Sequence, residues 1–93
     1  MKKGTYVVVT TKHRGVFGGQ FQSREGDEVV LSDARVCVYW SANVKGFVGL
    51  AATGPLSGSK ISDACPRMTL RDVTAILECS EAAEKQWEAG KWS

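Results

Sequence analysis

The sequence lacks any long apolar run. After Lys2 and Lys3, the first apolar stretch is only Tyr6–Val9. A signal peptide needs an apolar core of about 7–15 residues, and a membrane-spanning helix needs about 18 or more. We therefore expect a cytoplasmic protein that has no membrane partner.

Histidine is nearly absent too, since the chain has one, His13. Its neighbours Lys12 and Arg14 disfavour the protonated ring, which would suit a general base. A solvated histidine in a polar turn explains the same pattern more simply. No motif supplies a nucleophile with a basic partner, so the sequence predicts a protein that is not an enzyme.

The cysteines are few, odd in number and far apart. Paired zinc ligands usually stand about two to four residues from each other, and no two cysteines here do. In a reducing compartment such residues are typically buried thiols. We expect no metal and no cofactor from these three positions: Cys37, Cys65 and Cys79.

An excess of charge of one sign is also missing. The net charge is +2, which is weak evidence for a nucleic-acid partner. The distribution is more informative, because basic residues crowd the first part of the chain and acidic residues gather near its end. Such a polarity can steer an anionic ligand toward one end, although solvated turns and tails give the same pattern.

What is present is ordinary for a folded protein. The chain has 93 residues, of which 43% are hydrophobic and 24% charged. We expect one domain over 1–93, with an inserted segment rich in Gly and Ser at 41–66 and a C-terminal helix and tail at 80–93. A chain this small buries little surface alone, so we expect a homo-oligomer.

β-branched and aromatic residues place strands in the first half of the chain. We expect three of them, at 6–11, 16–23 and 28–40, with a sharp bend at Gly18-Gly19 in the second and a kink at Asp33-Ala34 in the third. Short polar turns between them predict a meander.

The second half mixes helix and strand. Residues 47–52 suit a short helix that packs Phe47 and Leu50 inward, and Gly54-Pro55 ends it. Pro55 to Lys60 suits an exposed loop. Short apolar residues at 68–70, a turn at 71–72 and a strand at 73–79 follow. Ser80 is a good N-cap for a helix over 81–87.

Several segments carry a resemblance to a known family. Gly15–Ser23, Gly26-Asp27 and Val29–Ala34 resemble the first motif of the Sm-like proteins (Sm, Lsm and Hfq), and Leu70–Ile76 is similar to the second. The RNA-contacting asparagine of that family is missing, and Asp72 stands where its second motif has glycine. The resemblance implies a mainly β fold: a small, strongly bent SH3-like or Sm-like barrel, with a short inserted helix and a short C-terminal helix.

The whole chain also resembles a group of small, uncharacterised bacteriophage proteins. The likeness lies in an opening valine-rich strand, Val30–Arg35, the pair Tyr39-Trp40, Leu50-Ala51 and the ending Val73–Cys79. It implies a phage origin and no particular chemistry.

Two groups of residues are candidates for ligand binding. In the first, Ser57, Ser59 and Lys60 stand in a loop whose amides and cation suit a phosphate, although the order of a Walker A loop is absent. In the second, Tyr39 and Trp40 point to opposite strand faces, so one of them can stack on a nucleobase. Arg35 stands four residues before Tyr39. A flexible loop and packing against a second subunit are the structural alternatives.

Three functional hypotheses follow. The chain binds and sequesters a small nucleotide, such as a host cyclic-nucleotide defence signal. Alternatively, it is an Sm-like binder of RNA or single-stranded DNA, which its mild charge does not favour. Alternatively, it is an interaction module that acts on a host protein.

Overall fold

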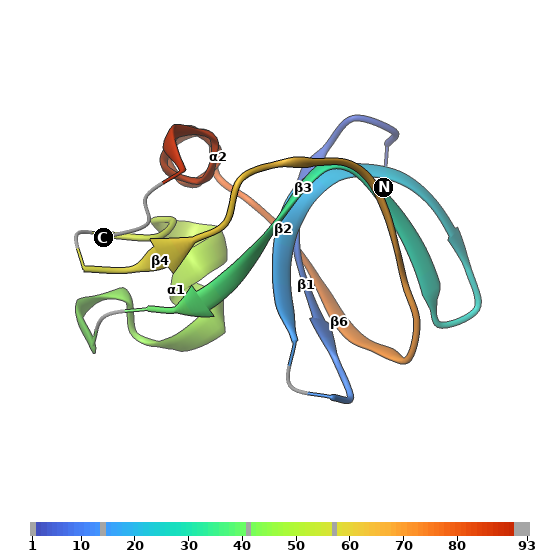
Figure 1. Ribbon diagram of the computed structural model, residues 1–93, viewed down its shortest axis with the longest axis horizontal. Coiled ribbons are helices and arrows are strands. Elements are labelled where there is room, and N and C mark those ends of the chain that lie inside the picture. The colour runs from blue at the N-terminus through green and yellow to red at the C-terminus, as the bar shows by residue number, and fades with distance from the viewer. Residues whose placement is uncertain (1, 14, 41, 57, 91–93) are drawn as a thin grey trace.

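The computed structural model describes residues 2–13, 15–40, 42–56 and 58–90. It is mainly β, as expected (Figure 1). The strands are β1 (Tyr6–Thr11), β2 (Val16–Glu25), β3 (Glu28–Tyr39), β4 (Lys60–Ile61), β5 (Cys65–Leu70) and β6 (Val73–Glu78). The helices are the 3-10 turn η1 (Ala42–Val44), α1 (Gly46–Ala52) and α2 (Glu81–Ala89).

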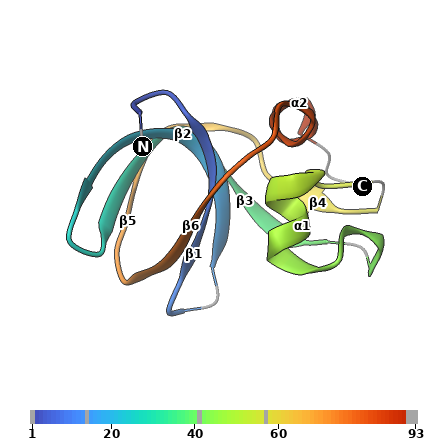
Figure 2. The ribbon, with the colours of Figure 1, turned by 180° about the vertical axis from the view of Figure 1, so that it is seen from behind.

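The strands form one bent antiparallel sheet in the order β4-β3-β2-β1-β6, and β5 pairs with the first half of β3. The predicted meander is therefore confirmed for β1 to β3. The long β2–β3 hairpin curls over the sheet so that β5 faces β1 and β6 across the bend (Figures 1 and 2). Among the described residues, no ladder joins β5 to β6, so the barrel-like sheet stays open.

Strand β3 is a single strand that continues through the expected kink. It runs from Glu28 to Tyr39 and changes direction at Asp33, which has φ 48. An aspartate tolerates this left-handed conformation better than a β-branched residue does. The chain therefore bends at the predicted kink without leaving the sheet, and β3 pairs with β5 as far as Ala34 and with β4 from Cys37 onward.

Both faces of the sheet are covered along β1. Val7 and Val9 pack inside the bend with the apolar residues of β2, β3 and β5. Tyr6 and Val8 point the other way, toward Leu50 of α1 and the rest of a second core. This double burial explains why β1 is a continuous valine run and does not alternate with polar residues.

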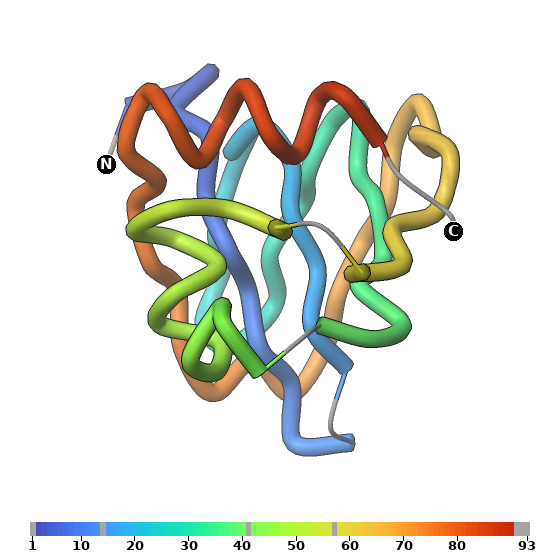
Figure 3. Tube along the Cα trace, turned by 90° about the vertical axis from the view of Figure 1, so that its left-hand side faces the viewer, coloured from blue at the N-terminus to red at the C-terminus, as the bar shows by residue number. Residues whose placement is uncertain are grey.

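The two helices cover the outer face of the bent sheet, where α2 lies across the strands and α1 lies beneath it (Figure 3). Trp87 of α2 is fully buried there, and its indole Nε1 donates to the carbonyl of Leu50 at 3.0 Å. The hydroxyl of Ser80 accepts from the amide of Ala83, as the predicted N-cap should. Both helices lie within two residues of their expected bounds.

The inserted segment corrects two expectations. Pro55 and Ser59 are fully buried, so 55–60 is not the exposed loop that was expected. The reason is β4, which pairs with the end of β3 and draws the preceding residues against the core. Phe47 was expected to point inward and is 40% exposed, because Leu50 and Ala51 supply the buried face of α1.

The expectation for the cysteines is met in part. All three are free thiols, but only Cys37 is buried, whereas Cys65 and Cys79 are partly exposed. The part of the chain that the structure describes contains no cluster of metal-ligating side chains. Over these same residues, none of the helices is long and apolar enough to cross a membrane.

Candidate functional site

The residues singled out from the sequence lie in different places. Arg35 points to the C-terminal end of α2, where its guanidinium donates to the carbonyl oxygens of Ser62 at 3.0 Å and Glu88 at 3.4 Å. A cation at this position also suits the negative end of the helix dipole. Arg35 thus joins β3 to α2 and to the segment between β4 and β5.

Tyr39 and Lys60 are neighbours across the β3–β4 ladder. The Tyr39 side chain is 55% exposed, and Lys60 is exposed too. Ser59 precedes Lys60 but is fully buried, and its backbone amide donates to the carbonyl of Leu56 at 3.0 Å. It offers no group to a phosphate in solvent. Ser57 lies outside the described residues.

Trp40 lines a cleft of about 460 Å³ between α1 and the ends of β1, β2 and β6. We call it the Trp40–Phe47 cleft, after the two aromatic side chains that line it from different segments. Trp40 is half-buried because it also packs against the outer core, and Phe47 stands at the start of α1. The rest of the lining is formed by Thr10, Thr11, Gly15, Val16, Thr74 and Ala75.

Two hydroxyls meet in this cleft. The side chains of Thr10 and Thr74 are hydrogen-bonded to each other at 2.8 Å. Either hydroxyl retains acceptor capacity, because a threonine oxygen has two lone pairs. The cleft therefore combines aromatic surface with a small polar group, which is the usual composition of a small-molecule site. Sequence reasoning found Trp40 but missed Phe47 and both threonines, since only the fold brings the three segments together.

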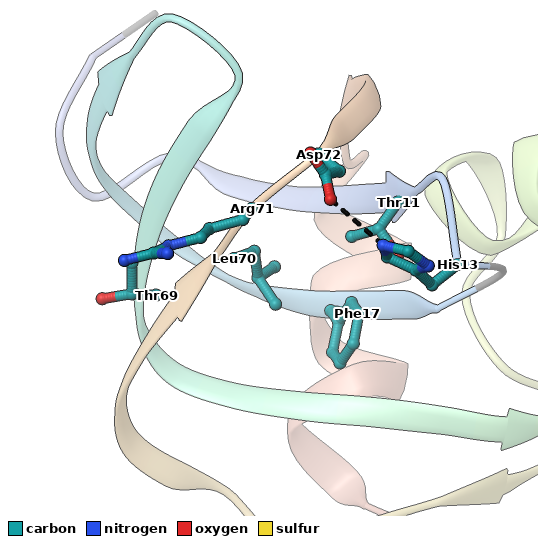
Figure 4. A pocket seen from close by; sticks show the side chains of 7 residues that line it. All are labelled: Thr11, His13, Phe17, Thr69, Leu70, Arg71 and Asp72. Atoms are coloured by element: carbon teal, nitrogen blue, oxygen red, sulfur yellow. Dashed lines mark hydrogen bonds and ion pairs between the residues drawn. The ribbon is translucent and has the colours of Figure 1, made fainter.

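A second hollow, of about 540 Å³, lies at the open end of the bend beside the β5–β6 turn (Figure 4). Phe17 and Leu70 form its apolar floor. His13 and Asp72 form its rim, with the imidazole Nε2 3.1 Å from a carboxylate oxygen. Arg71 extends away from His13 and lies 3.4 Å from Glu28.

The charges at this second hollow are solvated and paired. The side chains of His13 and Arg71 are 76% and 81% exposed, and each has an acidic partner. Exposed pairs of this kind contribute about 0–1 kcal/mol. Within the predicted basic turn at residues 12–14, the His13 side chain is thus already paired with the Asp72 carboxylate.

Two thiols are made less reactive by their surroundings. Burial raises the pKa of Cys37 to about 11. Burial also raises the pKa of Cys79 to about 12, and the charge of Glu84 acts in the same direction. Both thiols are thus protonated at neutral pH, and a protonated thiol is a poor nucleophile and a poor metal ligand.

The fold and its hollows define a small domain in which a bent antiparallel sheet is braced by two short helices. The chain belongs to a domain family of unknown function, DUF6948, whose model matches residues 4–87. Comparison with curated proteins and with solved structures gave no match.

Proposed function

We propose that this protein is a non-catalytic binding protein for a small nucleotide, with the base held in the Trp40–Phe47 cleft. The observation that supports this most is that two aromatic side chains from separate segments line one cleft of about 460 Å³. That volume lies within the ~300–1,000 Å³ typical of small-ligand sites.

Stacking is the main source of affinity in this proposal. A base that stacks on an aromatic side chain gains about 1–3 kcal/mol. Phe47 is 40% exposed, so its ring is available without any rearrangement of the core. The hydroxyls of Thr10 and Thr74 supply hydrogen bonds to a polar edge of the base.

Lysines near the cleft supply charge for a phosphate. Lys12 follows the lining residue Thr11, and Lys45 stands two residues before Phe47. Lys60 pairs with Tyr39, the neighbour of Trp40. All three lysines are exposed, so their ammonium groups are candidates for contact with a phosphate that extends from the cleft.

The resemblance to small phage proteins adds a biological role to this proposal. A non-catalytic protein that binds a nucleotide in such a setting would sequester a host signal, such as a cyclic nucleotide, in a homo-oligomer. Sequestration needs tight binding and no turnover, which agrees with the protonated thiols and with a cleft lined by aromatic, aliphatic and threonine side chains.

The direct test is native mass spectrometry combined with calorimetric titration of the purified protein. The probes are GMP, AMP and cyclic dinucleotides. We expect saturable binding of at least one of them, and an added mass of a few hundred daltons per site when the protein comes from cells that make the ligand. Absence of binding for all probes, and of any added mass, would refute the proposal.

Matched variants locate the site. Phe47→Leu removes the ring but keeps apolar volume, and the loss of one stacking contact should weaken binding about tenfold. Val48→Ala is its control, because Val48 is 60% exposed on the same helix and does not line the cleft. Lys60→Ala tests the phosphate contact against Lys85→Ala on α2. If Phe47→Leu and Val48→Ala bound the nucleotide equally well, the base would not lie on Phe47. If Lys60→Ala and Lys85→Ala bound it equally well, the phosphate would not contact Lys60.

Salt separates a nucleotide from a polynucleotide ligand. Affinity for RNA or single-stranded DNA should fall steeply as salt rises, because each neutralised phosphate releases counterions. A mononucleotide in the cleft should respond weakly. A steep salt dependence with an oligonucleotide probe would favour the Sm-like alternative.

The exposed apolar surface favours a protein partner as a second candidate. Val38 and Tyr39 at the end of β3 are 57% and 55% exposed, and Val48 on α1 is 60% exposed. A surface of this kind often marks an interface. If this surface is the functional one, Val48→Glu should abolish either self-association, measured by analytical ultracentrifugation, or the capture of a host protein. The same variant should leave nucleotide binding unchanged.

A further inference from the structure

A third hollow, of about 260 Å³, lies between the start of β1, the bend of β3 and the end of α2. It shares no residue with the Trp40–Phe47 cleft and is the most enclosed of the hollows described. Polar side chains from four elements line it together with Ala64. They are Tyr6, Gln20, Asp33, Arg35 and Glu88.

Tyr6 is the unusual member of this lining. The residue is 4% exposed, and its hydroxyl is a buried polar atom that has no hydrogen-bond partner among the described residues. A buried hydroxyl without a partner costs about 1–3 kcal/mol. Tyr6 and Gln20 are register partners on β1 and β2. The Tyr6 hydroxyl is therefore an unused donor and acceptor at this cavity, whereas the side-chain oxygen of Gln20 accepts from the Ser32 hydroxyl at 3.3 Å.

Arg35 adds a cation that is held in place by hydrogen bonds but forms no ion pair with a carboxylate of the described residues. Its two hydrogen bonds go to backbone carbonyls, those of Ser62 and Glu88. No carboxylate of the described residues lies within 4.0 Å of its guanidinium nitrogens. A guanidinium has five N–H donors, so some remain for a ligand.

Two carboxylates complete the cavity. Asp33 and Glu88 line it, and over the described residues neither side chain has a hydrogen bond or an ion pair. Asp33 has φ 48. A non-glycine residue in that region carries backbone strain, and such residues cluster at functional sites. The strained bend thus places a carboxylate in the lining of the same cavity as Arg35, which stands two residues further along β3.

These groups define the chemistry of an occupant. Arg35 and the Tyr6 hydroxyl can donate to an oxyanion, whereas Asp33 and Glu88 can accept from an ammonium group. A simple anion such as phosphate is disfavoured, because the two carboxylates outnumber the one guanidinium. A simple cation would leave Arg35 and Tyr6 unused. Only a molecule with both charges uses all four side chains.

We propose that this cavity binds a small free amino acid as a zwitterion, with its carboxylate on Arg35 and Tyr6 and its ammonium group on Asp33 and Glu88. The volume fits this size class. At about 30 Å³ per water molecule, 260 Å³ is room for roughly eight or nine waters. Sites for drug-sized ligands usually start at about 300 Å³.

The test is NMR titration of the ¹⁵N-labelled protein with glycine, L-alanine and L-serine. The half-ligands acetate and methylammonium, and inorganic phosphate, are titrated in parallel. We expect saturable shifts centred on residues 33–35 and on the Arg35 Nε for at least one amino acid. Each half-ligand should bind at least about tenfold more weakly, because it satisfies only one pair of side chains. No saturable shift with any amino acid at millimolar concentration, or acetate binding as tightly as glycine, would overturn the proposal.

Variants that preserve folding make the test specific. Tyr6→Phe removes one orphaned hydroxyl, so its melting temperature should not fall, while amino-acid affinity drops about tenfold. Tyr39→Phe is the matched control, since Tyr39 is 55% exposed and lies outside the cavity. Asp33→Asn keeps a residue that tolerates the bend, and should weaken amino-acid binding but not acetate binding. Unchanged amino-acid affinity in both Tyr6→Phe and Asp33→Asn would mean that the cavity holds only water.

Discussion

The indole ring of Trp87 lies directly on the backbone of Gly18. A Cβ atom added to Gly18 would stand 2.6 Å from Cδ2 and Cε3 of that ring. The ring of Tyr6 packs on the same indole, with 6.4 Å between centroids. Because Trp87 is fully buried and hydrogen-bonded to the carbonyl of Leu50, this contact fixes how α2 lies on the sheet.

Gly18→Ala should therefore destabilise the fold. The indole has no room to retreat, since it is buried among core side chains, and overpacking of a core typically costs about 1–3 kcal/mol. Urea unfolding followed by tryptophan fluorescence measures this loss. An unchanged midpoint would mean that α2 shifts on the sheet without cost.

A double-mutant cycle separates the Gly18–Trp87 contact from other effects. Trp87→Phe alone should be destabilising by about 3 kcal/mol or more, because it opens a cavity and leaves the Leu50 carbonyl unsatisfied. In the double variant the smaller ring makes room for the alanine methyl group, so the combined loss should be smaller than the sum of the single losses.

The Gly18 contact illustrates how far the sequence predicts the fold. The valine run of β1, the polar turns and the Ser80 cap are local features, so they predicted strands and α2 close to their true places. Gly18-Gly19 predicted a bend in β2. The close approach of Trp87, about seventy residues later in a chain of 93 residues, has no local sequence feature, because it depends on where α2 lies in three dimensions.

The candidate sites show the same limit. Tyr39 and Trp40 were both candidates for a ligand-facing aromatic, and of the two it is Trp40 that lines a cleft. Ser59 was chosen for its place in a loop rich in Gly and Ser, but the pairing of β4 with β3 buries it. Tyr6 was assigned only to a strand, since nothing local shows that its hydroxyl is left without a partner. Burial and pairing of distant residues decide these cases.

Ser80 gives a prediction about how the helices are joined. Its hydroxyl accepts from the amide of Ala83 at 3.0 Å and donates to the carbonyl of Ala52 at 2.7 Å, so one side chain caps α2 and holds the end of α1. Ser80→Ala should cost about 0.5–2 kcal/mol, measured as a loss of unfolding free energy in urea.

Ser80→Asp distinguishes the two roles of this hydroxyl. Aspartate is as good an N-cap as serine, but a carboxylate cannot donate to the carbonyl of Ala52. Full stability in Ser80→Asp would show that only the cap matters. A loss equal to that of Ser80→Ala would show that the bond to α1 dominates.

The raised pKa values of Cys37 and Cys79 predict a loss of stability at high pH. An unfolded chain releases its thiol protons near the ordinary pKa of 9.0, whereas burial raises the pKa of folded Cys37 to about 11 and that of Cys79 to about 12. The unfolded state therefore binds fewer protons above pH 9, and the unfolding free energy should fall as pH rises from about 9 toward 11–12. Well below pH 9, where the thiols are protonated in both the folded and the unfolded state, they should contribute no slope.

Urea unfolding at a series of pH values from neutral to alkaline checks this dependence. Cys37→Ala should flatten part of the alkaline slope, and Cys65→Ala is the control, because Cys65 is a partly exposed thiol that packs against neither core. Burial raises the pKa of Tyr6 as well, so the slope should be measured in Tyr6→Phe too. If the alkaline slope were unchanged in both Cys37→Ala and Cys79→Ala, other groups would be the cause of the pH dependence.

Asp72 predicts an order of stabilities in the β5–β6 turn. It has φ 57, a left-handed conformation that glycine adopts without strain and that aspartate tolerates. Relief of left-handed strain favours Asp72→Gly by about 1 kcal/mol, and two losses oppose it. These are the exposed pair with His13, worth about 0–1 kcal/mol, and the extra freedom of glycine in the unfolded chain, about 0.5–1 kcal/mol.

Asp72→Gly and Asp72→Asn should therefore have unfolding free energies close to that of the parent protein. Asp72→Val should lose about 1–3 kcal/mol, because a β-branched side chain is strained at positive φ. If Asp72→Val were as stable as Asp72→Gly in urea unfolding, the turn would not require a left-handed residue at this position.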